Sequence, residues 1–272
     1  MPRSSRPSGP TSPAPSPTAP LCRALEIGIE FGSRPALSGL TFEIHPGTIT
    51  AVIGPNGSGK TTLLNLLAGL ERPSSGELSW QRPHPPVAYL TQRHSTVRWL
   101  PLTSAEVIRM GRYRMRGLLR PMSAADRRFC TRVAGELEIG DLLHRQYGNL
   151  SGGQQQRVLV AQMLAQEARL ILLDEPITGL DLASQSRIIE IVGRQAAAGV
   201  AAVLTTHHLD EARDADQVLL LSEGRMVAAG SPGAVLTAAN LRSAYGDRVL
   251  APTTGGEITV LDDHGHDHGP PG

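Results

Sequence analysis

GPNGSGKTT, residues 54–62, follows the apolar run TITAVI at 48–53 and precedes a segment with leucines at helical spacing. The stretch fits the pattern G-x-x-x-x-G-K-[ST] between a strand and a helix, which is the setting that a phosphate-binding loop requires. Its glycines, Gly54, Gly57 and Gly59, let the backbone curl so that N–H groups face phosphate oxygens at the positive end of the following helix. The stretch therefore predicts an α/β fold built around a phosphate site.

Lys60 is the only lysine in a chain that has 26 lysine and arginine residues together. An ammonium group is compact enough to reach between phosphates inside a narrow loop, whereas the planar guanidinium of arginine needs an open approach. We therefore expect Lys60 to bind the β- and γ-phosphates, Thr61 to place its hydroxyl on Mg²⁺ and Thr62 to contact the next phosphate. The residues expected to contact the nucleotide phosphates in this loop are Gly54, Pro55, Asn56, Gly57, Ser58, Gly59, Lys60, Thr61 and Thr62.

The composition is that of an ordinary globular chain and argues against two other classes of protein. Of 272 residues, 40% are hydrophobic and 19% are charged, and the formal net charge of +1 favours neither a basic nucleic-acid binder nor an acidic tail protein. The apolar runs are far shorter than the ~18 residues of a membrane span, and the N-terminus lacks the apolar block of a signal peptide. Cys22 and Cys130 stand too far apart for a disulfide framework or zinc motif, which fits a reducing compartment.

The N-terminal part predicts a disordered leader followed by strands. Residues 1–20 are almost all Pro, Ser, Thr, Gly and Ala, a composition that cannot offset the entropy of ordering, and we place the leader at 1–22. Apolar residues then alternate from Leu25 to Phe31 and again from Leu40 to Ile44, which predicts a β-rich start to a domain at 23–249.

The rest of the domain predicts a helical insertion followed by a mostly parallel sheet. Residues 93–165 show long helical patterns with ten arginines between positions 93 and 132. RLILLD at 169–174 and VAAVLTT at 200–206 are apolar on both faces, as expected of buried parallel strands, with a helix between them that starts near Leu182. QVLLLSEGRMVAAG at 217–230 predicts a hairpin. A flexible tail is expected at 250–272.

Two adjacent acidic residues follow the apolar run at 169–174. A carboxylate at the end of a buried strand beside a phosphate loop is suited to hold Mg²⁺, and Asp174 is placed there. Glu175 follows and would point to the other side, where a hydrolytic water could be polarised. The alternative is that this Asp-Glu pair merely ends a strand at the surface.

The chain resembles the nucleotide-binding subunits of ABC transporters from about residue 25 to 230, and the most specific segment is LSGGQQQR at 150–157, which is similar to the family signature. The resemblance implies a P-loop ABC-type ATPase fold and a head-to-tail dimer. In such a dimer, Ser151 with the backbone of Gly152 and Gly153, and Gln154 beside them, would clamp the γ-phosphate that Lys60 of the second subunit holds.

Four more positions match family motifs. Gln92 resembles the glutamine that touches Mg²⁺ and the attacking water, and Asp181 resembles the aspartate that crosses the dimer interface. His207 resembles the histidine that hydrogen-bonds the γ-phosphate, and Phe31 occupies the place of the aromatic residue that stacks on adenine. Two positions depart from the pattern: Phe31 stands where tyrosine is commoner, and His208 stands where aspartate is usual, which leaves the role of position 208 open.

The resemblance implies an ATP hydrolase at the cytoplasmic face of the cell membrane. Its expected partners are a second nucleotide-binding subunit, separate membrane permease subunits and an extracytoplasmic substrate-binding protein. The segment RHSTVRWLPLTSAEVIRMGRY at 93–113 is similar to the subgroup that imports manganese and zinc. An iron-chelate or cobalamin importer subunit, an exporter subunit and a non-transport ABC ATPase are the alternatives.

Two charged segments allow both a specific and a general interpretation. DDHGHDH at 262–268 carries His264, His266 and His268 among aspartates, which suit Zn²⁺, Mn²⁺ or Ni²⁺, but it equally fits a solvated tail. The arginines between 93 and 132 fit a solvated helical face. Alternatively, some of them, with Arg112 and Arg116 as candidates, face anionic lipid headgroups or the permease.

Overall fold

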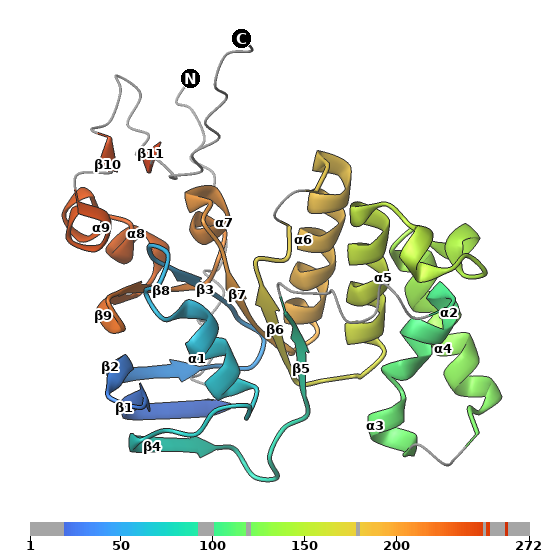
Figure 1. The fold of residues 1–272 in the computed structure, drawn as a ribbon, viewed down its shortest axis with the longest axis horizontal. Coiled ribbons are helices and arrows are strands. Elements are labelled where there is room, and N and C mark those ends of the chain that lie inside the picture. Colours follow the sequence, from blue (N-terminus) through green and yellow to red (C-terminus); the bar gives the residue numbers. More distant parts are fainter. Residues whose placement is uncertain are drawn as a thin grey trace, which may run out of the picture.

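The structure is a computed structural model that describes residues 19–91, 101–117, 121–177, 180–246, 249–250 and 259–260. Its centre is a six-stranded sheet in the order β5-β6-β7-β3-β8-β9 (Figure 1). The first five strands of that order are parallel, and β9 runs antiparallel to β8. The strands are β5 (Val87–Leu90), β6 (Leu170–Asp174), β7 (Ala201–Thr205), β3 (Ile49–Ile53), β8 (Gln217–Ser222) and β9 (Arg225–Gly230). This arrangement confirms the predicted α/β fold with a mostly parallel sheet.

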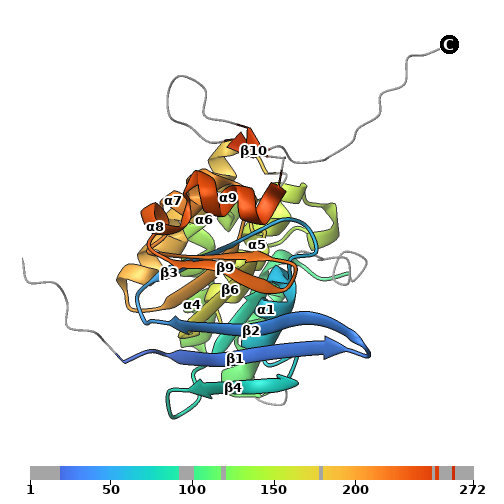
Figure 2. The same cartoon turned by 90° about the vertical axis from the view of Figure 1, so that its left-hand side faces the viewer.

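A second, antiparallel sheet holds the N-terminal strands in the order β2-β1-β4, and Figure 2 looks onto it. Its strands are β1 (Cys22–Phe31), β2 (Arg34–Ile44) and β4 (Ser75–Trp80). The alternation predicted from Leu25 onward is interrupted, because Glu26 adopts φ 51° at a shift in the pairing with β2. Leu25 is therefore exposed, whereas Ile27 and Ile29 are buried.

Helices cover both faces of the central sheet. The leucines of α1 (Lys60–Leu67) share one apolar core with Leu170 and Leu172 of β6 and with residues of β1 and β2, so α1 lies between the two sheets. Ile171 and Leu173 of β6 belong to another core with α5 (Gly152–Leu164) and α6 (Leu182–Ala197), on the opposite face (Figure 1). Successive residues of a strand point to opposite faces, which is why this buried strand is apolar throughout.

The described residues between 101 and 165 form helices. They are α2 (Ser104–Met110), α3 (Tyr113–Arg116), α4 (Ala124–Glu136), the short 3₁₀ helices η1 (Gly140–Leu142) and η2 (Tyr147–Asn149), and α5. Capping boxes start α2 at Thr103 and α4 at Ser123. In each, the hydroxyl accepts a hydrogen bond from the backbone N–H three residues later, and the carboxylate of that later residue accepts the backbone N–H of the capping residue. The sequence therefore sets these helix starts locally.

Arg112 is the main departure from the expectations for this region. Only 7% of Arg112 is exposed; its Nε and Nη2 donate to Asp126 Oδ1 over 3.1 and 2.9 Å, and its Nη1 donates to the carbonyl of Ala165 over 3.0 Å. It also pairs with Glu167 and lies over the ring of Phe129. Arg112 thus neither faces solvent nor meets lipid headgroups, so both interpretations are wrong for this residue. Nothing is described of the side chain of Arg116.

The C-terminal part adds α7 (Leu209–Arg213), α8 (Pro232–Val235), α9 (Ala238–Tyr245) and the paired strands β10 (Val249–Leu250) and β11 (Thr259–Val260). The region predicted as a flexible tail thus contains one short strand pairing, and His264, His266 and His268 lie outside the described residues. Leu21 and Cys22 are buried, so the predicted leader at 1–22 is too long at its end. In the described parts of the chain, no helix combines the length and apolar character needed to span a bilayer.

Candidate functional site

The loop after β3 needs its glycines for steric and conformational reasons. Gly54 has φ 148°, and a Cβ there would lie 2.1 Å from the carbonyl oxygen of Leu221 in β8. Gly59 has φ 100°, and a Cβ there would lie 2.5 Å from Leu37 Cδ2 in β2. Gly57 is in open space but has φ 78°. Positive φ angles favour glycine at all three positions, and at Gly54 and Gly59 a Cβ would also clash with neighbouring strands.

Lys60 begins α1 and folds its side chain back into the loop. Its Nζ donates to the carbonyl oxygens of Gly54 over 2.8 Å and Pro55 over 3.1 Å, and only 7% of the residue is exposed. The ammonium group thus sits inside a narrow turn of backbone, as the sequence argument required.

A cleft of about 720 Å³ lies over this loop, a size typical of small-molecule sites. Phe31, half exposed at the end of β1, lines it together with Glu175. The other lining residues are Arg34, Pro35, Ala36, Asn56, Gly57, Ser58, Gly59, Lys60, Thr61, Thr62, Glu223 and Gly224. The cleft therefore brings together most of the predicted loop, the aromatic residue and one carboxylate, and it adds Arg34 and Glu223, which sequence reasoning did not identify.

Asp174 is held by two hydroxyl groups. Thr61 Oγ1 donates to Asp174 Oδ2 over 3.0 Å, and Thr205 Oγ1 donates to Asp174 Oδ1 over 2.6 Å. The register explains this, because Thr205 of β7 pairs with Asp174 of β6 on one side and with Val52 of β3 on the other. Since parallel strands end at the same edge of the sheet, Asp174 comes next to the helix that follows the loop.

Glu175 takes a different set of partners. It adopts φ 50°, its N–H donates to Thr205 Oγ1 over 2.9 Å, and its carboxylate contacts Nε2 of His207. The side chains of Glu175 and His207 are 12% and 16% exposed, respectively. Asp174 and Glu175 therefore point to different neighbours, and they do not simply end a strand at the surface.

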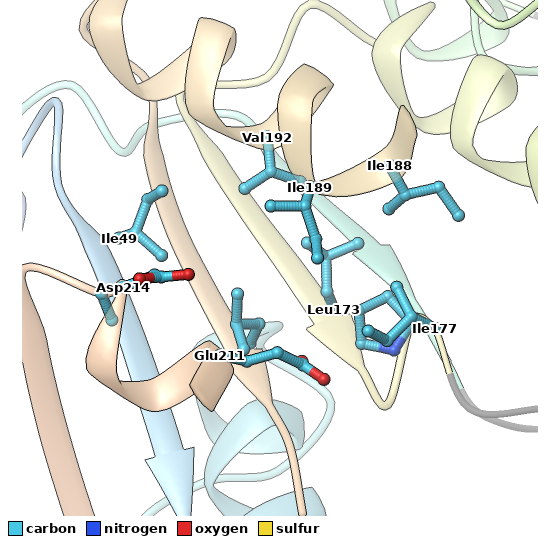
Figure 3. Close-up of a pocket in the computed structure, with 11 residues that line it drawn as sticks. Ile49, Leu173, Ile177, Ile188, Ile189, Val192, Glu211 and Asp214 are labelled. Atoms are coloured by element: carbon cyan, nitrogen blue, oxygen red, sulfur yellow. The ribbon is translucent and has the colours of Figure 1, made fainter. Parts of the chain in front are cut away.

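The side chain of Thr206 links the backbone of His208 to the side chain of Glu211. The N–H of His208 donates to Thr206 Oγ1 over 2.9 Å, and a hydrogen bond also joins the side chains of Thr206 and Glu211. Burial raises the pKa of Glu211 above its ordinary value. Figure 3 shows Glu211 beside a small apolar pocket under α6, of about 70 Å³. His208 is exposed and forms the N-cap position of α7, so His207 is the histidine of this pair that reaches Glu175.

The segment at 151–154 lies at a different place on the subunit. Ser151 is the N-cap of α5, its hydroxyl accepts the N–H of Gln154 over 3.3 Å, and Gln154 Oε1 accepts the N–H of Ser151 over 3.1 Å. Ser151 and Gly152 are exposed, and none of the four residues lines the cleft. The helix that they start covers the face of the sheet opposite α1.

Asp181 lies close to this segment. It is the N-cap of α6, where it accepts the N–H and hydroxyl of Ser184, both over 2.9 Å. These bonds lower the pKa of Asp181. A Cβ at Gly153 would lie 3.2 Å from Asp181 Oδ2, so the starts of α5 and α6 meet. Gln92 and residues 178–179 lie outside the described residues.

The loop has features that fit a magnesium-bound nucleotide. The hydroxyl of Thr61 and the carboxylate of Asp174 are hard oxygen donors, which Mg²⁺ prefers. The described residues contain no group of three or more His, Cys, Asp or Glu that could hold a metal alone. Ser58 Oγ is buried and has no hydrogen-bond partner among the described residues, so the loop leaves a polar atom for a ligand. The donor set suits a cation that also binds phosphate.

Comparisons with known proteins agree with this geometry. The ABC transporter family matches residues 37–178. The zinc import ATP-binding protein ZnuC of Halorhodospira halophila is 32% identical over 254 residues, 93% of this chain and 91% of that protein. The manganese transport system ATP-binding protein MntB of Bacillus subtilis is 32% identical, with 82% and 91% covered. The hemin import ATP-binding protein HmuV of Streptomyces coelicolor is 34% identical, with 93% and 95% covered.

Two solved structures are similar in fold. One, described as a metal-chelate type ABC transporter in an inward-facing conformation, is 29% identical with a TM-score of 0.75, and the match covers 83% of this chain and 89% of that one. The other is a dimeric structure of a bacterial ABC transporter cassette, 24% identical with a TM-score of 0.68, and it covers 78% and 98%. At 24% identity, the similarity to this second structure is evidence for the fold alone.

Proposed function

The chain belongs to the ABC transporter family, and from this premise we propose that it is an ATP-binding subunit whose hydrolysis of ATP drives the import of a metal ion or metal chelate. The observation that carries the proposal is that the Lys60 loop and Glu175 line one cleft, while at the same edge of the sheet Thr61 bonds to Asp174 and Glu175 contacts His207.

The cleft residues divide into those that bind the base and those that bind the phosphates. We assign adenine stacking to Phe31, which is half exposed on the cleft wall and loses only a hydroxyl relative to tyrosine. The N–H groups of 54–59 and the start of α1 would face the β- and γ-phosphates. Lys60 would exchange the carbonyls of Gly54 and Pro55 for phosphate oxygens. The remaining loop residues would shape the turn.

Thr61, Asp174 and Gln92 are proposed to hold the magnesium ion. When bound, Mg²⁺ offsets the charge that develops on the phosphates. Thr61 already donates to Asp174, so the two groups need little movement to share a cation. Gln92 is proposed from its motif.

Glu175 is proposed to orient the attacking water, and His207 to hydrogen-bond the γ-phosphate. Glu175 lines the cleft and its carboxylate contacts Nε2 of His207, which supports assigning both groups to one reaction. Positioning and electrostatics supply most of the catalysis in phosphoryl transfer, so this arrangement of fixed groups is what the reaction needs.

A second copy of the chain is proposed to complete the site. ATP-binding subunits of this family dimerise and work with membrane permease subunits. Ser151 and Gly152 are exposed at the start of α5, and Ser151, Gly152, Gly153 and Gln154 do not line their own cleft. The start of a helix attracts anions, so in a head-to-tail dimer this segment would clamp the γ-phosphate of the partner, with Asp181 crossing the interface. The assembly is placed at the cytoplasmic membrane face, supplied by an extracytoplasmic binding protein.

Two classes of transported substrate are candidates, a metal ion and a metal chelate. Relatives named for zinc import, manganese transport and hemin import are 32%, 32% and 34% identical to this chain. The segment at 93–113 favours manganese or zinc, whereas the 34% identity with the hemin import protein supports a metal chelate as the second candidate. The His264, His266 and His268 tail is proposed to bind the transported metal. The test is to titrate zinc by calorimetry into the full chain and into a chain that ends at residue 260. Equal zinc binding by the two chains would contradict that proposal.

The decisive experiment reconstitutes the whole transporter. The permease would be co-purified with this chain and placed in liposomes with its binding protein, and ATP hydrolysis would be measured with Zn²⁺, Mn²⁺ and hemin. Stimulation by one of them, abolished in Lys60→Ala, is expected. If the chain recruits no membrane partner or hydrolyses no ATP in that assembly, the proposed function is wrong.

A further inference from the structure

Thr205 is a buried hydroxyl that lies next to the catalytic edge of the sheet without lining the cleft. It ends β7, has no exposed surface and pairs with Asp174 on one neighbouring strand and Val52 on the other. It cannot contact a nucleotide in the cleft, so any effect on catalysis has to pass through its neighbours.

The hydroxyl of Thr205 both donates and accepts a hydrogen bond. Thr205 Oγ1 donates to Asp174 Oδ1 over 2.6 Å and accepts from the N–H of Glu175 over 2.9 Å. One side chain thus holds the carboxylate proposed to bind Mg²⁺ and the peptide proposed to carry the water-orienting carboxylate. A valine has the same shape but would leave a buried acceptor and a buried donor unpaired, which is costly.

Both bonds fix a geometry that would otherwise be free. With Oδ1 of Asp174 occupied by Thr205, the other oxygen, Oδ2, faces Thr61. Glu175 adopts φ 50°, a backbone conformation that is unfavourable for a residue with a Cβ and persists only where the surroundings impose it. The bond from the Glu175 N–H to Thr205 is one such restraint, and it directs the Glu175 side chain toward His207.

We infer that Thr205 is a positioning residue that aligns the magnesium-binding and water-orienting carboxylates through one hydroxyl. This inference rests on the ATP hydrolysis proposed above. A positioning role predicts that loss of the hydroxyl lowers the rate of the chemical step while nucleotide binding stays almost the same. A purely structural role does not predict this difference.

The test compares Thr205→Val with Thr205→Ser and with Thr50→Val. Thr50 is also fully buried, lies on the neighbouring strand β3 and bonds to Gln217 over 3.3 Å, away from both carboxylates. We expect Thr205→Val to lower kcat by about 10- to 100-fold, because a displacement of about 1 Å has effects of that size, while KM for ATP changes less than about threefold. The Mg²⁺ concentration for half-maximal activity should rise. Thr205→Ser should stay within about threefold of the wild type.

Thr50→Val controls for lost stability. It should lower the melting temperature as Thr205→Val does but leave kcat unchanged. The inference is overturned if Thr205→Val keeps wild-type kcat, if serine does not restore it, or if Thr50→Val lowers kcat equally.

Crystal structures separate this inference from the proposed function. In Thr205→Val, the φ of Glu175 should leave the positive region or Asp174 should lose its contact with Thr61. If the wild-type assembly hydrolyses no ATP, the proposed function fails. The positioning role is then decided by these structures alone, and an unchanged Asp174–Glu175 geometry overturns it.

Discussion

Thr61 Oγ1 donates a 3.0 Å hydrogen bond to Asp174 Oδ2, although the two residues are 113 positions apart in the chain. The bond joins the helix after the phosphate loop to the end of β6, across the sheet edge where β7 lies between β6 and β3. The two oxygen donors proposed to hold Mg²⁺ therefore lie within hydrogen-bonding distance of each other.

Asp174→Asn should lower magnesium-dependent ATP hydrolysis by about 100-fold and raise the Mg²⁺ requirement. The change keeps the shape but removes the charge that attracts the cation, and first-coordination changes of this kind have large effects. ATP hydrolysis measured over a Mg²⁺ titration checks this. Asp141→Asn alters an exposed aspartate at η1 and should behave as the wild type. Equal titration curves for Asp174→Asn and the wild type would contradict the metal assignment.

Glu175→Gln should bind ATP and dimerise but hydrolyse ATP at least about 100-fold more slowly. The amide keeps the hydrogen-bonding shape next to His207, but it no longer polarises water as a carboxylate does. Nucleotide binding by fluorescence, dimerisation by gel filtration with ATP, and phosphate release check the three parts. Glu77→Gln on β4 is the exposed control. Full turnover by Glu175→Gln would remove Glu175 from its proposed role.

The parts of the site that depend on local chemistry could be predicted from sequence. The phosphate loop is one, because the glycines and Lys60 are adjacent in the chain and the turn itself demands them. Asp174 could be placed because an acid ending an apolar strand has few other uses beside such a loop. Thr205 was missed, since its role depends on β7 lying between β3 and β6, and sequence periodicity does not give the order of strands.

Two further departures have the same origin. The positive φ of Glu26 shifts the register of β1, and no residue-type signal such as glycine marks that position. Arg112 was expected at a surface because arginine is rarely buried. Its partners, Asp126 and Glu167, lie 14 and 55 residues away in the chain, so only the packing of α3, α4 and the end of α5 brings them together.

Gly54→Ala should destabilise the chain much more than Gly57→Ala. A Cβ at position 54 would lie 2.1 Å from a backbone carbonyl oxygen of β8, which forces the strand or the loop to move at a cost of about 3 kcal/mol or more. Among the described residues, a Cβ at position 57 meets nothing within 4 Å, so only its φ of 78° opposes alanine, at about 1 kcal/mol. Chemical denaturation without nucleotide checks the difference. Equal losses would mean that β8 does not confine the loop.

Arg112→Met should cost about 3 to 5 kcal/mol of unfolding free energy, because it leaves Asp126, which is 2% exposed, as a buried charge without its main partner. The double change Arg112→Met with Asp126→Leu should recover a large part of this loss. Arg128→Met, at an exposed position on the same helix as Asp126, should change stability by less than about 0.5 kcal/mol. An Arg112→Met variant as stable as Arg128→Met would show that the ion pair does not hold α4 to α3.

Glu211→Gln should become more stable relative to the wild type as the pH rises. Burial raises the pKa of Glu211, while the hydrogen bond from Thr206 and the charges of His208 and His207 oppose the increase. The folded state therefore keeps its proton at pH values where the unfolded chain has released it, and this contribution to stability is full below about pH 4.5 and is lost as the pH rises through the folded-state pKa.

Glutamine does not titrate, so the difference in melting temperature between variant and wild type should be small near pH 4 and should increase toward pH 8 in favour of the variant. Thermal unfolding at several pH values checks this, with Glu77→Gln as an exposed control that should show no such trend. A difference that shrinks with rising pH would mean that hydrogen bonding to the carboxylate, and not its burial, dominates at Glu211.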